Sequence, residues 1–380
     1  MSSGVIIAIV AVVVVLLAVV AFFCCRRGRQ NKLPVPETPP GFTPQNGGAY
    51  NPHNDYNHEP MLPIRDPQPP KPLAVQPPKR QERPAPAKAA DTEHFFPGLV
   101  NYRLDESEVL LTRKVSTGAF GVVWLGHYHG QPVAVKKMID GDDESQAFAR
   151  EIDTMSRLTH PKIVRFIGCT WTSGKDLSAV TEFMDGGDVR TLLENRKIDL
   201  TWKKEKISIA VDVAEALAFM HSLNPKIIHR DLKSRNVLLN GQMVAKLSDF
   251  GLSRDRTYEE TLTAGVGTVR WTAPEVMLGD NYSEQADVYS FGVVLSELDT
   301  REIPFEEKST SRTGAGGGAP DMAIVIKVAK GELRPTFAAD CPEIIKKIAN
   351  ACLQFDPALR PSASSVVRML NDAKLQLQSA

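Results

Sequence analysis

An unbroken apolar run lies near the start of the chain. The 19 residues from Val5 to Phe23 carry no charge, and as a helix they would extend ~28 Å at about 1.5 Å per residue, close to the thickness of a bilayer core. Arg26, Arg27 and Arg29 follow the run, and by the positive-inside rule they keep the rest of the chain cytosolic. A cleaved signal peptide is the alternative, but it needs positive charge before the run. We therefore expect a single-span membrane anchor over residues 1–25.

The following stretch, 26–104, has a different composition. Between Pro34 and Pro97 lie 17 of the chain's 27 prolines, among Asn, Gln and Lys. Such a segment cannot bury enough apolar surface to fold, so we expect a basic, proline-rich, disordered linker that is locally polyproline II. The stretch PQPPKP at 67–72 contains P-x-x-P spacings, which makes SH3 and WW domains candidate partners of this linker.

From about residue 105 the apolar positions follow the pattern of a folded domain. Short β-rich runs separated by glycine turns predict antiparallel strands over 108–138. Apolar residues at helical spacing then predict a helix within 144–158 and a longer one later. These residues are Phe148, Ile152, Met155 and Leu158 in the first helix and Ile207, Ala210, Val211, Ala214, Leu217 and Ala218 in the second. A β-rich part followed by a helix-rich part predicts an α+β fold of two lobes with a cleft between them. Residues 309–320 are expected to form a flexible insertion in the second lobe.

Composition and charge narrow the function classes. Lys and Arg number 45, as do Asp and Glu, so the chain lacks the broad positive charge typical of nucleic-acid binding, and no nucleic-acid partner is expected. The five cysteines show neither metal-ligand spacing nor an even disulfide framework, which favours a reducing compartment.

A phosphate-binding element is predicted in the β-rich part. Gly118 and Gly121 lie in a turn between two strand-like runs, where backbone N–H groups can approach phosphate oxygens. Lys136 ends an apolar run, so its ammonium needs an anionic partner. Glu151, on the predicted helix that follows, is positioned to be that partner. A glycine turn alone is a weak signal, since most such turns only connect strands.

Two carboxylates, Asp231 and Asp249, lie near the two ends of the segment HRDLKSRNVLLNGQMVAKLSDFG at 229–251. Mg²⁺ prefers oxygen ligands and commonly takes one or two carboxylates together with substrate phosphates. Asn236 and Asp249 can supply such ligands, with Mn²⁺ as an alternative cation. Asp231 is then left to accept the proton of an attacking hydroxyl, and Lys233 to stabilise the transferring phosphoryl group.

In this order the motifs resemble the protein-kinase signature. The resemblance covers about residues 107–373, and we expect a protein-kinase domain over 105–375. The matching segments are Ser116-x-Gly118-x-x-Gly121-x-Val123, Val133-Ala134-Val135-Lys136, Glu151, His229-Arg230-Asp231-Leu232-Lys233-x-x-Asn236, Asp249-Phe250-Gly251 and Ala273-Pro274-Glu275. The family's first loop glycine is Ser116 in this chain; we expect this to tune the affinity for ATP without abolishing activity.

The resemblance implies an ATP-dependent phosphotransferase with a magnesium cofactor. The residues that it assigns to catalysis are Lys136, Glu151, Asp231 and Lys233, and those that it assigns to the metal are Asn236 and Asp249. The residues that it assigns to nucleotide binding are Ser116, Gly118, Gly121, Val123, Ala134, Lys136, Thr181 at the gatekeeper position, Glu182 and Met184 in the hinge, and Leu238. It also implies that Asp287 and Arg360 anchor the helical lobe.

The hydroxyl specificity follows from residues around these motifs. Lys233 and Thr268 resemble serine/threonine kinases, whereas VRWTAPE is also similar to tyrosine kinases. The mixture is most similar to the tyrosine kinase-like group, whose members usually phosphorylate serine and threonine on proteins. The resulting hypothesis is a membrane-anchored, cytosolic serine/threonine kinase in signal transduction. The alternatives are a membrane-tethered scaffold or pseudokinase with weak turnover and a tyrosine or dual-specificity kinase.

A regulatory hypothesis concerns the segment after Asp249. Arg230 can pair with a phosphate in this segment and thereby order it. The available acceptors are Thr257, Tyr258, Thr261 and Thr263. We expect autophosphorylation at Thr261 or Thr263 to activate the enzyme; mass spectrometry of active protein without phosphate at all four positions would contradict this.

Overall fold

A computed structural model of the chain describes residues 95–118, 121–138, 142–250, 268–279, 283–306 and 321–379. All of them lie in one unit, Glu82–Ala380. The expected anchor, most of the proline-rich linker, the insertion at 309–320 and the four acceptor hydroxyls lie outside the described residues. Within the part that is described, no helix has the length and apolar character needed to span a bilayer.

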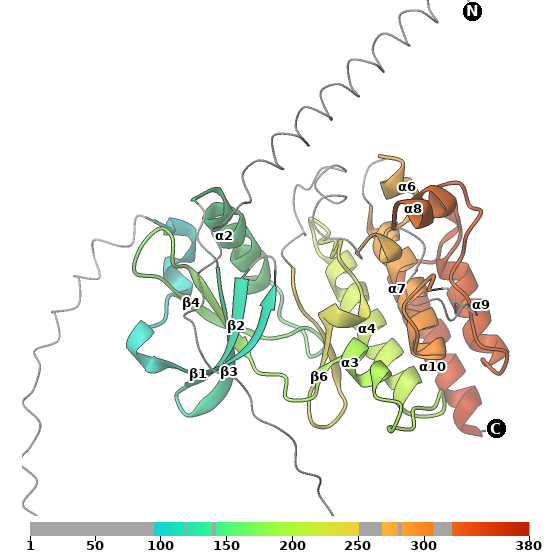
Figure 1. Ribbon diagram of the computed structural model, residues 1–380, viewed down its shortest axis with the longest axis horizontal. Coiled ribbons are helices and arrows are strands. Elements are labelled where there is room, and N and C mark those ends of the chain that lie inside the picture. The colour runs from blue at the N-terminus through green and yellow to red at the C-terminus, as the bar shows by residue number, and fades with distance from the viewer. Residues whose placement is uncertain are drawn as a thin grey trace, which may run out of the picture. The chain divides into compact units, whose positions relative to one another are not determined.

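The first lobe is built on a five-stranded antiparallel sheet, in the order β1-β2-β3-β5-β4 (Figure 1). The strands are β1 (Val109–Gly118), β2 (Gly121–Tyr128), β3 (Gln131–Lys137), β4 (Phe166–Thr170) and β5 (Ser178–Glu182). The turn between β2 and β3 contains His129 and Gly130, both with positive φ, as two-residue hairpin turns that match the strand twist require. The predicted antiparallel strands are confirmed.

The two faces of this sheet carry different residues because side chains alternate along a strand. On one face Val133, Val135 and Val180 are buried in a small apolar cluster. On the other face, Lys136 lies opposite Ala179 in the strand register, and a second cluster packs against α2 (Asp142–Ser156). This places the lysine on the side of the sheet that faces α2.

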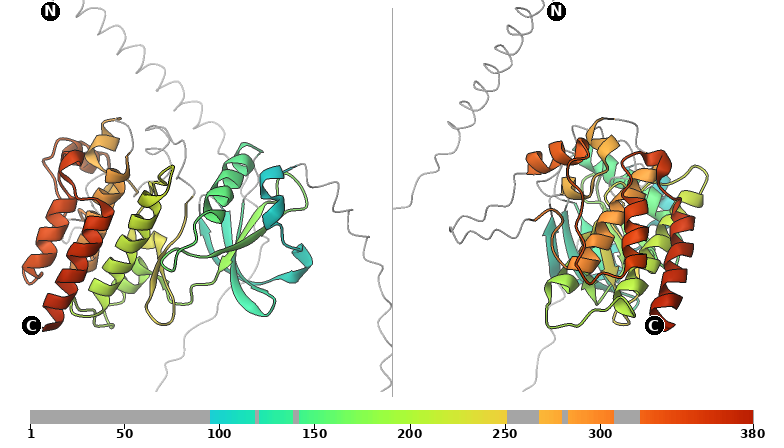
Figure 2. Two further views of the ribbon diagram at one scale, coloured as in Figure 1. Left: turned by 180° about the vertical axis from the view of Figure 1, so that it is seen from behind. Right: turned by 90° about the vertical axis from the view of Figure 1, so that its right-hand side faces the viewer.

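The second lobe is helical. Its helices are α3 (Val189–Glu194), α4 (Glu205–Ser222), α6 (Pro274–Met277), α7 (Glu284–Thr300), α8 (Asp321–Ala329), α9 (Glu343–Cys352) and α10 (Ala363–Ser379). A three-stranded sheet of β6 (Gly187–Asp188), β7 (Val237–Leu239) and β8 (Ala245–Leu247) lies near the first lobe. Short 3₁₀ turns complete the described elements: η2 (Pro97–Tyr102), η3 (Glu106–Glu108), η4 (Ser234–Asn236), η5 (Thr268–Trp271) and η6 (Pro357–Leu359). The left view of Figure 2 shows the sheet-based lobe beside the helical one. The α+β, two-lobed fold is therefore confirmed, and α2 and α4 are the two helices predicted from apolar spacing.

Helix α7 is the centre of the second lobe. Every residue from Ala286 to Asp299 is buried, and a helix buried on all sides is typical of the core of a large domain. The lobe is closed by Arg360, whose guanidinium donates to both carboxylate oxygens of Glu275 at 2.6 and 2.7 Å. Such a two-point pair fixes orientation as well as distance, so it holds α6 against the segment that precedes α10.

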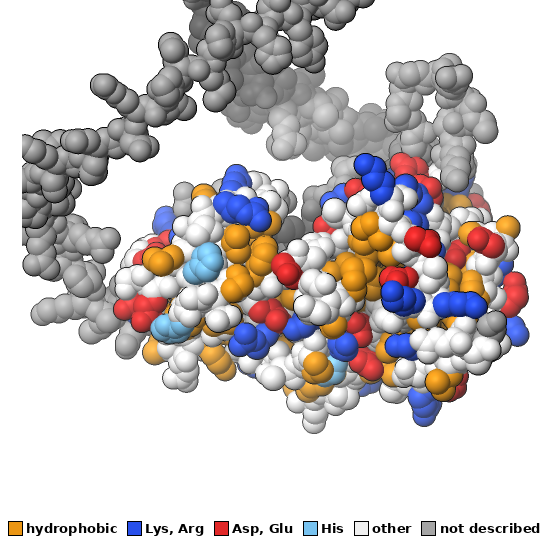
Figure 3. All heavy atoms as spheres, turned by 90° about the horizontal axis from the view of Figure 1, so that it is seen from below, with side chains coloured by type: hydrophobic (Ala, Val, Ile, Leu, Met, Phe, Trp, Pro, Cys, Tyr) orange, Lys and Arg blue, Asp and Glu red, His pale blue; other side chains and the backbone are white. Residues whose placement is uncertain are grey.

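Charges of both signs are interspersed on the surface. On the face drawn in Figure 3, basic and acidic side chains of the described residues alternate over both lobes, with apolar side chains between them. This mixed pattern agrees with the equal numbers of acidic and basic residues in the sequence.

Candidate active site

Lys136 is the point where three elements meet. From β3, its Nζ donates to Oε1 of Glu151 on α2 at 2.9 Å and to Oδ1 of Asp249, after β8, at 2.9 Å. Alternation along β3 explains why the lysine faces this way, since the flanking Val135 is buried on the opposite face. The expected pairing of Lys136 with Glu151 is therefore present in the structure.

The electrostatics of this trio follow from one ammonium between two carboxylates. Burial alone lowers the pKa of Lys136, but Asp249 and Glu151 outweigh burial and raise that pKa above its ordinary value. The lysine in turn holds the pKa of Asp249 below its usual range, whereas burial raises the pKa of Glu151 against the opposing effect of Lys136. Lys136 thus stays charged between the two carboxylates.

Asp231 lies in a second polar cluster, on the catalytic-loop side. Lys233 donates its Nζ to both carboxylate oxygens of Asp231, at 3.0 and 2.8 Å. The amide Nδ2 of Asn236 donates to Oδ2 of Asp231 at 2.9 Å and to its main-chain oxygen at 2.8 Å. These contacts fix the carboxylate in one orientation, at the edge of the protein, with only 9% of the residue exposed.

Asp287 of α7 binds the loop that carries Asp231. The main-chain N–H groups of His229 and Arg230 donate to its two carboxylate oxygens at 2.8 and 2.9 Å, and Nε2 of His221 lies 2.9 Å from Oδ2. Burial raises the pKa of Asp287, but these hydrogen bonds and the nearby histidines outweigh it and hold the pKa below its usual range. The ionised carboxylate keeps Arg230 at a positive φ of 66°, a strained conformation that needs such support.

Asp249 reaches the same place by a short chain of contacts. Its own φ is 63°, and the following Phe250 is buried beside the ring of His229, with 5.3 Å between ring centroids. The preceding Ser248 donates its N–H to the main-chain oxygen of Asn236 at 2.9 Å. Asp249 is therefore held near Asn236.

These side chains fit a magnesium ion. Asn236 uses its amide nitrogen on Asp231, which leaves the amide oxygen for another partner. Asp249 accepts from Lys136 through Oδ1 and is 43% exposed. Hard oxygen atoms of this kind are what Mg²⁺ or Mn²⁺ takes in phosphate sites, and a divalent cation would offset the excess of carboxylate over ammonium around Lys136.

Several residues predicted to surround the nucleotide lie on adjacent strands of the first sheet. Val123 pairs with Lys136 across β2 and β3, and Ala134 pairs with Thr181 across β3 and β5. Ala134 is half-buried between fully buried neighbours in β3, and so is Leu238 in β7. Partly exposed apolar positions of this kind are typical of a ligand pocket.

The glycine turn is closed by the pairs of Ser116 with Val123 and of Gly118 with Gly121. Gly121 has a φ of 147°, and a Cβ atom there would lie 2.3 Å from the main-chain oxygen of Lys137. Only glycine fits so close an approach. The tip, residues 119 and 120, lies outside the described residues.

The contacts of Glu182, one of the predicted hinge residues, were not evident from the sequence. The carboxylate of Glu182 accepts from Lys246 at 2.7 and 2.9 Å and from the main-chain N–H of Arg165 at 2.7 Å. Its side chain therefore ties β5 to β8 across the lobes, and its main-chain N–H donates to the main-chain oxygen of Arg165 at 3.0 Å. Met184 is buried at 6% exposure.

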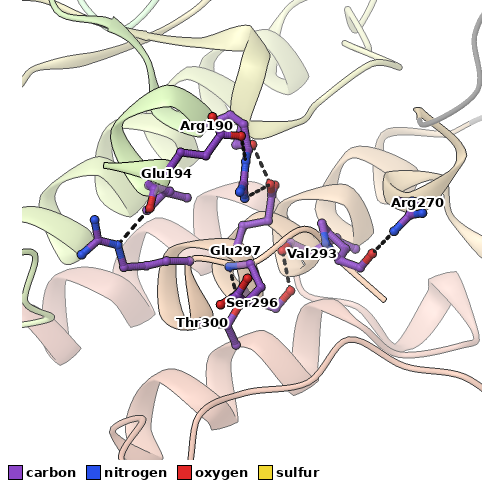
Figure 4. A network of polar contacts seen from close by, with 12 residues as sticks. Arg190, Glu194, Arg270, Val293, Ser296, Glu297 and Thr300 are labelled. Carbon is purple, nitrogen blue, oxygen red and sulfur yellow. Dashed lines mark hydrogen bonds and ion pairs between the residues drawn. The ribbon is translucent and has the colours of Figure 1, made fainter. Parts of the chain in front are cut away.

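A second network missed in the sequence surrounds Glu297 of α7 (Figure 4). Its carboxylate accepts from the hydroxyl of Ser234 at 2.6 Å and from the indole N–H of Trp271 at 2.6 Å, and Nη1 of Arg190 lies 3.9 Å away. These residues join the catalytic loop, η5 and α3 to α7. The available signal was a charged residue within the otherwise apolar run GVVLSEL.

Comparison with known proteins decides the family. Residues 109–370 match the model of the protein tyrosine and serine/threonine kinase family. The chain belongs to this family. The kinase is 36% identical over 274 residues to probable serine/threonine-protein kinase drkC of Dictyostelium discoideum, an alignment that covers 70% of this chain and 35% of drkC. It is 34% identical over 277 residues to serine/threonine-protein kinase STY17 of Arabidopsis thaliana, covering 72% of this chain and 46% of STY17. The kinase thus spans less than half the length of these relatives.

Proposed function

We propose that this kinase transfers the γ-phosphate of ATP to serine and threonine hydroxyls of proteins, as a member of the tyrosine kinase-like group. The observation that carries the proposal is the contact of Lys233 Nζ with both oxygens of Asp231. A lysine in this position neutralises the phosphoryl group during transfer and leaves the carboxylate able to accept a proton. The two relatives with serine/threonine-protein kinase in their names support the same specificity.

The proposed mechanism assigns one task to each side chain. Asp231 orients the attacking hydroxyl and accepts its proton as the phosphoester forms and ADP leaves. Lys136, kept in place by Glu151, binds the phosphates, and Asn236 and Asp249 hold the cation. The bound Mg²⁺ would supply charge neutralisation between the phosphates. Half-buried Val123, Ala134 and Leu238 would enclose the base.

Phosphate transfer by the full-length protein tests this proposal. Purified protein is incubated with labelled ATP, Mg²⁺ and a general protein substrate, followed by phosphoamino-acid analysis, with Asp249→Asn as control. We expect phosphoserine and phosphothreonine that disappear in the control. Phosphotyrosine as the main product would replace the specificity proposal with the tyrosine alternative. No transfer by protein that still binds ATP and Mg²⁺ would favour the scaffold alternative.

We also propose that the kinase is anchored in a membrane by residues 5–23 and acts in signalling from its cytosolic face. The support is the uncharged, 19-residue apolar run and the arginines that follow it. A charged residue at the centre of such a run disfavours insertion by about 2.5–3.5 kcal/mol. Replacement of Val13 and Val14 by Arg should therefore move the protein from the alkali-resistant membrane fraction to the supernatant, whereas Val13→Leu should leave it in the membrane. Wild-type protein in the supernatant would refute the anchor.

A further inference from the structure

The segment before the first strand is packed against the catalytic domain. Its 3₁₀ turn η2 (Pro97–Tyr102) lies against α2 and β4, as Figure 1 shows at the cyan start of the coloured chain. Phe96 and Leu99 are 3% and 2% exposed. The segment precedes the family match, which starts at residue 109, and the sequence predicted a linker up to residue 104.

Apolar contacts hold this segment in place. Phe96 packs its ring edge-on against Trp171, with 5.6 Å between centroids and 83° between planes. Phe96 and Leu99 belong to one buried cluster with Phe148 and Ile152 of α2. One side of the cluster is thus formed by the segment before β1, and another by α2, the helix that carries Glu151.

Polar contacts fix the register of the same segment. Arg103 donates from Nη2 to the main-chain oxygen of Trp171 at 2.9 Å, and its guanidinium lies 4.5 Å from the centroid of the Trp171 ring. The N–H of Leu104 donates to the oxygen of Cys169 at 2.9 Å. Leu104 also fills the space beside Gly168, where a Cβ atom would lie 2.6 Å from it. Residues 95–104 are therefore seated in a fitted site.

The cluster is connected to the catalytic ion pair through α2. Phe148 and Ile152 are four residues apart on α2, and Glu151 lies between them in the sequence. The ring centroid of Phe148 lies 5.4 Å from Nζ of Lys136. Because a helix moves as a rigid element, turning Glu151 away from Lys136 would also withdraw Phe148 and Ile152 from Phe96 and Leu99. That movement would expose apolar surface and is opposed by the hydrophobic effect.

We propose that Phe96 and Leu99 are positioning residues of this kinase, which hold α2 in the orientation that pairs Glu151 with Lys136. They act from outside the family domain, through α2, and touch neither nucleotide nor protein substrate. A kinase domain without residues 95–104 would retain the catalytic side chains but populate the paired state less. Any partner that lifts the segment from α2 would lower activity.

A double-mutant cycle in the full-length protein tests this inference. Phe96→Ala and Leu99→Ala are each made in the wild-type and in a Glu151→Gln background. In the wild-type background we expect kcat/KM to fall about tenfold, because only the fraction of molecules with a paired Glu151 is competent. In the Glu151→Gln background, which already lacks the ion pair, we expect no further loss. Leu99→Met, which keeps a large apolar side chain, should retain the activity that Leu99→Ala loses. Asn101→Ala, at an exposed position of η2, should match wild type.

The opposite results overturn the inference. An equal fold loss in both backgrounds would show that the segment only stabilises the fold, and unchanged kcat/KM in the wild-type background would show that it does nothing for α2. Amide hydrogen exchange gives a readout that does not depend on transfer. Faster exchange in α2 of Leu99→Ala, with α4 and α7 unchanged, supports the proposal, and unchanged exchange in α2 contradicts it. The kcat/KM comparison depends on the proposed phosphate transfer, whereas the hydrogen-exchange comparison does not. Absence of transfer by wild-type protein would therefore refute the proposed function and leave the exchange test of this inference in place.

Discussion

The two sides of the predicted cleft, the helical wall and the sheet wall, present the predicted catalytic groups by different means. On the helical side, Asp231 belongs to a loop whose backbone N–H groups are bound by the fully buried Asp287 of α7. On the sheet side, Lys136 depends on Glu151, a residue of a helix that is held by apolar contacts and by one ion pair. Hydrogen bonds are directional and apolar contacts are not. The loop that carries Asp231 is therefore held in one geometry, whereas helix α2, which carries Glu151, has an orientation that can be gained or lost.

This difference explains where regulation can act. A carboxylate buried with complete hydrogen bonding cannot be moved without leaving charged or polar groups unsatisfied. A helix packed through Phe148 and Ile152 can turn if the residues opposite them leave, since each buried side chain of this size contributes only about 1.5–3 kcal/mol. Control of this kinase is thus expected at α2 and the segment beside it.

The largest effect is expected from breaking the helical wall at Asp287. Asp287→Ala removes the acceptor of two main-chain N–H groups and of His221, in contacts that are buried or part-buried. Loss of a buried, hydrogen-bonded charge costs about 3–5 kcal/mol, so we expect a drop of this size in the free energy of unfolding, together with loss of phosphate transfer. Urea denaturation followed by tryptophan fluorescence measures it. Asp340→Ala, at an exposed position, is the control, and equal stability of the two variants would contradict the prediction.

Asp231→Asn should separate chemistry from stability on the same wall. The amide keeps the size of the side chain and one of the two hydrogen bonds from Lys233, but it accepts a proton poorly. We expect kcat to fall about 10²–10⁴-fold, the usual contribution of a positioned general base, while the urea midpoint stays near that of wild type. Initial rates at saturating ATP measure the change. A loss of kcat smaller than about tenfold would remove Asp231 from the role of proton acceptor.

Glu297 should make the stability of the helical wall depend on pH. Burial raises its pKa to about 7, against the opposing hydrogen bonds from Ser234 and Trp271 and the charge of Arg190. Between the ordinary value of 4.5 and about 7, the folded protein keeps a proton that the unfolded chain releases. Unfolding free energy should therefore fall as pH rises through this window, by on the order of 3 kcal/mol from this group.

Glu297→Gln, which retains a hydrogen-bonding side chain of the same size, should remove that part of the pH dependence. Unfolding free energies of wild type and variant at pH 5 and pH 8 provide the measurement, and the comparison cancels groups common to both. Parallel pH profiles of the two proteins would show that Glu297 is ionised throughout. Asp287 does not confuse the result, since its lowered pKa places its loss of stability at more acidic pH.

The contrast between the walls also marks what the sequence could predict. Motif order and apolar spacing predicted the two lobes, α2, α4 and the pairing of Lys136 with Glu151, because each of these depends on local pattern or on short motifs. The contacts of Glu297 with Trp271 and Ser234 were not predicted, because they join segments far apart in the chain. The η2 segment escaped because a 3₁₀ turn has no long periodicity and Phe96 and Leu99 are buried only by a tertiary site on α2. The anchor, the linker partners and the roles of the individual site residues stay predictions.

The smallest effect is expected on the outer face of α2, where an ion pair resembles the catalytic one in chemistry but differs in setting. Arg157 donates to Asp153 at 2.6 Å, with side-chain exposures of 53% and 34%. Water and salt screen such a pair, which is worth about 0.3–0.5 kcal/mol. Asp153→Asn should therefore change unfolding free energy by no more than this and leave kcat/KM within about twofold, measured in low and high salt. A loss comparable to that of Glu151→Gln would mean that the outer face of α2 also sets its orientation, and that apolar packing by Phe96 and Leu99 is not sufficient to hold the helix.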